Sequence, residues 1–214
     1  MTPAPHHAIS ASYRPAILAL ILLGTAIAAC GPSSLHSTIS SSKLKDMSRQ
    51  GQLWVYDAEN GIVVALDRLD EARDEFYRLR RQIKLADRRL EAAERRGRSL
   101  GVTVAEAWKD QLKSLRKWAV ARIRLGRVGL VVARAAVELA KAQIIHREDL
   151  LGGKSFNVKK FADQLQEFQQ AYETRKKTVH RMRRRARKLE SHWRKLRLRY
   201  VAQTGDYDSG LWTD

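Results

Sequence analysis

The 214-residue chain has 23 Asp and Glu residues and six His, but the sequence does not place them in a persuasive catalytic or metal-binding set. Cys30 is the only cysteine, and it ends the run Ile27-Ala28-Ala29-Cys30 directly after an uncharged apolar stretch. His146, His180 and His192 are scattered, without a second histidine or a carboxylate at ligand spacing beside them. The sequence therefore predicts no catalytic residues, no metal site and no bound cofactor, and it leaves the Cys30 thiol as the group for covalent chemistry.

The first thirty residues have the layout of a secretory signal. Residues 1–14 carry one fixed positive charge and no acid, and residues 15–29 are uncharged and rich in Ala, Leu and Ile. About 15 apolar residues fall short of the roughly 20 that a membrane-spanning helix needs. The run Ile27-Ala28-Ala29-Cys30 resembles the lipobox of bacterial lipoproteins, which reads aliphatic, small, small, cysteine. The resemblance implies a signal peptide over 1–29, cleavage between Ala29 and Cys30, and diacylglycerol and acyl chains on Cys30.

Two other interpretations of this segment stay open, namely an ordinary signal peptide cut after Ala29 and an uncleaved anchor. The residue after Cys30 is Gly31. In the lipoproteins that this run resembles, an aspartate at that position retains many members in an inner membrane. We therefore expect a lipid-anchored protein of the bacterial cell envelope. In a Gram-negative cell, the periplasmic leaflet of the outer membrane is favoured.

Behind the signal, the sequence predicts a tether, a helical body and a tail. Residues 30–42 are Ser-rich and uncharged, which is typical of a flexible tether. Over residues 43–203, apolar side chains recur at alternating spacings of three and four, which indicates helix seams. Glycine-containing breaks divide this body into three helices at about 43–97, 103–150 and 157–203, and an acidic tail over 204–214 follows.

Local signals refine the helix ends. The dipeptide Asn60-Gly61 favours a turn, but the apolar spacing continues through it, so we expect the first helix to start between Lys43 and Leu53 and to be continuous. Thr103 followed by Glu106 is a capping-box pattern that predicts the start of the second helix. Ser155 or Asn157 is expected to cap the third helix.

The predicted fold is all-α, an elongated antiparallel three-helix coiled coil in an up-down-up arrangement. Large and small residues alternate in the first two seams, which predicts a close pair in which Ala65 and Leu69 lie near Leu130 and Ala133. The second helix is apolar over a wide arc and is expected to be central. The bulkier third helix is expected to fill the groove beside the close pair, with its basic end away from the lipid.

Positive charge concentrates in the third helix. The chain has a formal net charge of +18, and residues 154–203 carry 16 basic against 4 acidic residues. The residues predicted to bind an anionic partner are Arg175, Lys176, Lys177, Arg181, Arg183, Arg184, Arg185, Arg187, Lys188, Arg194 and Lys195. Around the seam positions Met182 and Ala186, the four arginines from Arg183 to Arg187 are expected to point outward. Arg175 alone departs from the apolar seam.

One alternative is that the basic face has no binding role, is exposed to solvent and is partly neutralised by the acidic residues of the first helix. If the face does bind a partner, the sequence predicts a structural or adaptor protein. Such a protein is held at the membrane by its lipid and contacts anionic phospholipid, an acidic envelope polymer or an acidic protein. A tethered periplasmic chaperone of the holdase type is a second hypothesis, although matched seams argue against the open cleft that it needs. Nucleic-acid binding requires a cytoplasmic location and is disfavoured if the lipobox is real. Self-association into a homo-oligomer stays open.

Overall fold

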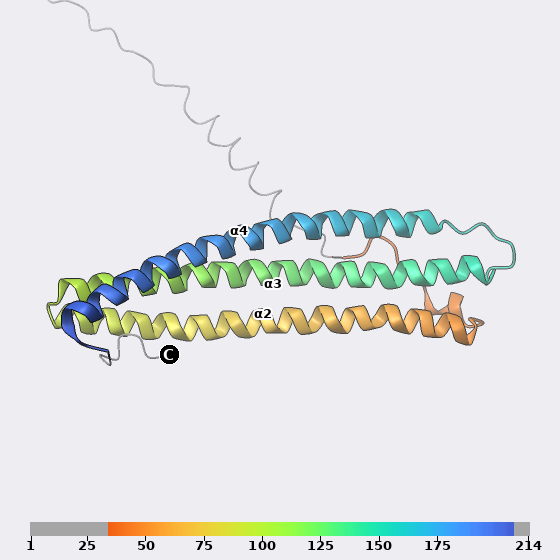
Figure 1. The fold of residues 1–214 in the computed structure, drawn as a ribbon. Coiled ribbons are helices and arrows are strands. Elements are labelled where there is room, and N and C mark those ends of the chain that lie inside the picture. The colour runs from red at the N-terminus through yellow and green to blue at the C-terminus, as the bar shows by residue number, and fades with distance from the viewer. Residues whose placement is uncertain (1–33, 208–214) are drawn as a thin grey trace, which may run out of the picture. The chain divides into compact units, whose positions relative to one another are not determined.

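The computed structural model describes residues 34–207, which form three long helices packed against each other. A short 3-10 helix, η1, spans Ser41–Leu44, and the helices α2, α3 and α4 span Arg49–Arg95, Ser99–Arg147 and Val158–Thr204 (Figure 1). No strand occurs among the described residues, so the all-helical prediction is confirmed at this level. The predicted signal peptide, Ala29, Cys30, Gly31 and the tail from residue 208 onward lie outside the described residues.

Helix α2 runs without interruption through Asn60 and Gly61, as the apolar spacing predicts. It begins at Arg49, where the Ser48 hydroxyl accepts a hydrogen bond from the Gly51 backbone N–H. It ends where Gly97 adopts a positive φ of 67°, a conformation that glycine reaches without steric penalty.

The capping-box prediction for α3 is wrong. The helix already begins at Ser99, and the residue before it, Arg98, makes no side-chain capping bond. The Thr103 hydroxyl lies inside the first turns and donates to the Ser99 carbonyl oxygen at 3.0 Å. The chain reverses within a few residues at Gly97, so α3 starts four positions before the predicted start at Thr103. For α4, Asn157 is the cap and accepts from the Lys160 backbone N–H at 3.1 Å.

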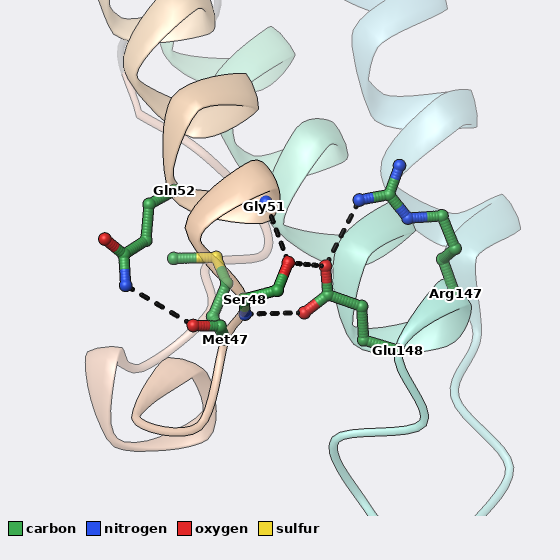
Figure 2. Close-up of polar contacts among 6 residues, drawn as sticks. All are labelled: Met47, Ser48, Gly51, Gln52, Arg147 and Glu148. Carbon is green, nitrogen blue, oxygen red and sulfur yellow. Dashed lines mark hydrogen bonds and ion pairs between the residues drawn. The ribbon is translucent and has the colours of Figure 1, made fainter.

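The first turn of α2 is bonded to the last residues of α3. Glu148 accepts the Ser48 backbone N–H at 2.8 Å through one carboxylate oxygen and the Ser48 hydroxyl at 2.6 Å through the other. Arg147 also contacts this carboxylate at 3.2 Å (Figure 2). Ser48 therefore serves both as a cap for α2 and as a bridge to the α3 terminus, which holds these two helix ends together.

Helix α3 lies between the other two helices, as its wide apolar arc predicts. It packs along α2 on one side and along α4 on the other, whereas no Cα atom of α2 lies within 8 Å of one in α4. The third helix therefore fills the groove beside the first two only towards the Gly97 turn, where Trp193 and Tyr200 pack in clusters that include α2 residues. Along the rest of its length α4 packs on α3, which carries apolar surface on two sides.

Two clusters that join side chains of all three helices lie towards the Gly97 turn. There Ala93 of α2, Val104 of α3 and Tyr200 of α4 belong to one buried cluster. Gly101 admits the Tyr200 ring, because a Cβ atom at Gly101 would come within 3.3 Å of it. Trp193 of α4 packs against a neighbouring cluster of α2 and α3 residues. The close approach of α4 to this end of the pair is visible in Figure 1.

The described part of the expected flexible tether is bound to the helices. Gln164 of α4, which is 5% exposed, accepts the backbone N–H groups of His36 and Ser37, both at 2.8 Å. Ile39 is buried, and its backbone N–H donates to the Glu138 carboxylate of α3. The composition of this segment is typical of a linker and does not predict the attachment. The segment is held by two apolar side chains, Leu35 and Ile39, and by a few backbone hydrogen bonds.

Candidate anion-binding groove between helices α3 and α4

The predicted anion-binding residues all lie on α4, and most of them are exposed to solvent. The exposed set comprises Lys176, Lys177, Arg181, Arg184, Arg185, Arg187, Lys188, Arg194 and Lys195. Arg175 and Arg183 are half-buried. The predicted residues therefore divide into a broad solvated surface and two arginines that contact the rest of the protein.

Few of these cations have an acidic partner among the described residues. Lys176 pairs with Glu173 at 3.1 Å and Arg194 pairs with Glu190 at 2.6 Å, each within α4. The ion pairs of the α2 acids go to α2 itself and to α3, for example Arg122 with Glu75 at 3.1 Å. Among the described residues, the structure records no ion pair between an α2 carboxylate and one of the eleven predicted cations of α4.

Arg183 does not point away from the helices as expected. Its guanidinium lies over the Trp118 ring of α3, 4.5 Å from the ring centroid, and Arg122 contacts the same ring at 5.1 Å. Such stacking is typical of arginine and withdraws it from solvent. Arg183 is therefore a packing residue at the α3–α4 contact, and Arg184, Arg185 and Arg187 carry the exposed charge.

Arg175 lines a groove between α3 and α4, which we name the basic groove. Its four cations are Arg116, Lys117 and Arg124 from α3 and Arg175 from α4. Val120 and Met182 contribute apolar surface between them, and the cavity has a volume of about 360 Å³. No acidic residue lines it, and none of the four cations makes an ion pair with another described residue.

Sequence reasoning missed the three α3 cations of this groove. From the sequence, no binding role is predicted for Arg116, Lys117 or Arg124. A signal was nevertheless present, because Arg116, Val120 and Arg124 follow each other at intervals of four, which places them on one face of a helix. What the sequence could not show is that this face lies beside Arg175, because that depends on the register between α3 and α4.

The basic groove has the chemistry of an anion-binding site. Arginine presents a planar fork of donors that fits phosphate and carboxylate oxygens, and lysine adds a compact charge. Four like charges around one cavity repel each other, so an anion that enters relieves this repulsion in addition to forming hydrogen bonds. The apolar floor suits an anion that carries hydrocarbon.

A second hollow, which we name the apolar trough, lies where the backbones of α2 and α4 stay more than 8 Å apart. It is lined by residues of all three helices, among them Val64 and Ala65 of α2, Gly126 and Gly129 of α3, and Tyr172 of α4. Its volume is about 500 Å³. The matched seams had suggested closed packing, so this open hollow is a departure from expectation.

Several other features of the described residues bear on function. Within residues 34–207, no group of three His, Cys, Asp or Glu side chains is placed to hold a metal ion. Among the same residues, no helix is both long and apolar enough to cross a membrane. Comparison of the chain with protein-family models, with curated proteins and with solved structures gives no match.

Proposed function

We propose that this chain is a lipid-anchored bacterial envelope protein that acts as a structural adaptor. In this proposal, Cys30 carries the anchor, and the three helices form an antiparallel, up-down-up coiled coil that presents basic side chains to an anionic envelope surface or partner. The run Ile27-Ala28-Ala29-Cys30 supports the anchor. The bond between Ser48 and Glu148, together with the cluster that joins Ala93 to Val104, supports the antiparallel order.

The observation that carries the anionic target is the lack of acidic partners along α4. Only Lys176 and Arg194 of its eleven predicted residues pair with a described acid, and the recorded ion pairs of the α2 acids are with α2 and α3. A surface of this kind keeps a sustained positive potential, which attracts anionic surfaces and is weakened by salt. Envelope phospholipid, an acidic polymer and an acidic protein are the partner classes that fit this location.

A holdase chaperone is the second candidate, because the apolar trough supplies the open cleft that it needs. The exposed side chains of Val63, Val64 and Leu66 extend apolar surface along α2 near this trough. An unfolded client would bind there through apolar side chains. Suppression of the aggregation of an unfolded client, and its loss in Val64→Asp, would favour this candidate over the adaptor.

Two measurements test the proposed function. Labelling of cells with a fatty-acid analogue should mark the wild-type protein, and Cys30→Ser should abolish the label and release the protein into the soluble envelope fraction. Replacement of Arg184, Arg185, Arg187 and Lys188 by Glu should abolish binding of the purified protein to anionic vesicles or polymer without loss of helix content. An unlabelled wild type rejects the anchor, and binding that survives both the reversal and high salt rejects the anionic target.

A further inference from the structure

The N-terminal segment and the basic groove occupy the same face of the α3–α4 pair. On α3, Val131 packs near Leu35 and Glu138 bonds Ile39, and residues at spacings of three and four lead back from Val131 to the basic groove. That series is Arg116, Val120, Arg124, Arg127 and Val131. The segment over 35–40 therefore lies on the same face of α3 as the basic groove, about two turns further along the helix.

The residues of α4 independently place the N-terminal segment and the basic groove on one face. Gln164 and Phe168 contact the N-terminal segment, while Arg175 and Met182 line the basic groove. Phe168, Arg175 and Met182 follow each other at intervals of seven, which keeps them on one face. Seven residues advance a helix by about 10 Å, so the two contact regions are separated by only two turns.

Covalent connection brings the anchor close to this site. Leu35 follows Cys30 by five positions, and five steps of even fully extended chain span no more than about 18 Å. The segment 35–39 also runs from Phe168 towards Phe161, so it enters the groove from the side on which the basic groove lies. The length of this connection therefore allows a lipid on Cys30 to hold the flank of α3 and α4 at a membrane surface.

We propose that the basic groove binds the phosphate headgroup of an anionic phospholipid in the membrane that holds the Cys30 anchor. This inference rests on the proposed anchor and deepens the proposed function by naming the partner and the orientation. The α3–α4 face then lies along the membrane surface, with Arg116, Lys117, Arg124 and Arg175 at the headgroups. The apolar trough, on the opposite face, points away from the membrane.

The chemistry of the basic groove favours a phospholipid headgroup over the chain's own residues before Leu35. The residues that precede Leu35, from Cys30 to Ser34, carry no acidic side chain and cannot neutralise four cations. A phospholipid supplies a phosphate for the arginine forks and hydrocarbon for the Val120 and Met182 surface. Anchor and headgroup sit in one bilayer, so binding of the second becomes effectively intramolecular once the first is inserted.

The first experiment compares two charge-matched variants of the full-length acylated protein. One replaces Arg116, Lys117, Arg124 and Arg175 by Gln, and the control replaces four exposed α2 cations, namely Arg80, Arg81, Lys84 and Arg88, by Gln. Binding is measured to phosphatidylcholine vesicles with and without one-fifth phosphatidylglycerol. The affinity that depends on phosphatidylglycerol should fall at least about tenfold below the wild-type value in the groove variant. In the α2 variant it should fall less than about threefold.

Gln is a good helix former, and circular dichroism checks that both variants keep their helices. If the groove variant unfolds, Arg116→Lys, Arg124→Lys and Arg175→Lys together keep the charge and should retain vesicle binding. Equal losses in the groove and α2 variants would overturn the proposal, because they would mean that net charge alone decides binding. Displacement of the protein from vesicles by equimolar duplex DNA phosphate would also overturn it and assign the groove to nucleic acid.

The second experiment measures orientation. Cys30 is the only native cysteine and is blocked when acylated, so a fluorophore can be placed on Arg127→Cys at the groove face or on Val64→Cys at the trough. A quencher attached to lipid headgroups should quench the label at 127 and leave the label at 64 bright. Equal quenching, or the reverse order, overturns the side-on orientation and leaves the anchor intact. A labelled Cys30 thiol, by contrast, rejects the proposed anchor itself.

Discussion

Leu69 of α2 lies directly against Gly126 of α3. A Cβ atom at Gly126 would come within 3.2 Å of both the Cα and the Cδ1 of Leu69. Contacts this short to a backbone atom cannot be relieved by a rotamer change. Glycine at this position therefore lets the α2 and α3 backbones approach each other, which outweighs its low helix propensity of about 1 kcal/mol relative to alanine.

Gly126→Ala should lower the free energy of unfolding by about 1 to 2 kcal/mol, because the overpacking exceeds the gain in propensity. Gly61→Ala provides a control within α2, since a Cβ atom there meets nothing within 4 Å. That substitution should raise the free energy of unfolding by up to about 1 kcal/mol. Urea unfolding of both variants measures the difference, and a shift of the same sign in both would contradict the close approach at Gly126.

Much of the helical layout could be predicted from the sequence. The spacing of apolar residues predicts that α2 continues through Gly61 and that α3 lies in the centre. It could not predict that the backbones of α2 and α4 stay more than 8 Å apart, because one wide apolar arc fits both a closed triangle and an open layer. The choice depends on whether the second α3 seam is complete, which only the packing of Ala135 and Phe168 reveals.

The small residues of the α2–α3 seam should differ in their tolerance of larger side chains. Ala119 is fully buried among Leu79, Leu112 and other apolar residues, so Ala119→Leu should lower the free energy of unfolding by about 1 to 3 kcal/mol. Ala65 is half-buried and borders the apolar trough, so Ala65→Leu should be nearly neutral. Thermal unfolding distinguishes the two. A large loss at Ala65 would mean that the trough is closed in solution.

The candidate site was only half visible in the sequence. The charge run on α4 drew attention to Arg175, but its groove partners on α3 are separated from it by about fifty residues. Likewise, the Ser-rich composition of 30–42 could not show that Gln164 binds backbone groups of that segment. In both places the missing information is the register between elements, and local composition does not encode it.

The bond between Glu148 and Ser48 should make stability depend on pH. Hydrogen bonds from the Ser48 hydroxyl and backbone N–H, helped by Arg147, lower the pKa of Glu148. A lowered pKa contributes stability that is present above the ordinary glutamate pKa of about 4.3 and is lost as the pH falls below it towards the native pKa. We expect the wild type to lose stability over this acidic range.

Glu148→Gln should remove that component of the acid loss, because the side chain no longer titrates. Glu106→Gln is the matched control, since Glu106 is exposed and makes no ion pair or hydrogen bond that the structure records among the described residues. Urea midpoints between about pH 3 and pH 7 give the comparison. An identical pH slope in wild type and Glu148→Gln would show that the carboxylate bridge does not form in solution.

Gln164 should control whether the N-terminal segment stays on the α3–α4 groove. Its amide oxygen accepts the N–H groups of His36 and Ser37, and its amide nitrogen donates to the Ser37 carbonyl oxygen at 3.3 Å. Gln164→Leu keeps similar bulk but leaves these backbone groups without a partner, which costs roughly 1 to 3 kcal/mol for each buried group. The segment should therefore detach while α4 stays helical.

Hydrogen exchange of residues 35–39 gives the measurement, with exchange of the α4 amides as an internal reference. Gln169→Leu is the control, because Gln169 is an exposed residue on the same helix. Faster exchange of the segment in Gln164→Leu alone would show that the side chain holds it. If the segment is protected equally in both variants, Leu35 and Ile39 suffice to attach it, and the hydrogen bonds to Gln164 add little. Because the side-on orientation depends on this attachment, Gln164→Leu should also reduce the contrast in quenching between labels at positions 127 and 64.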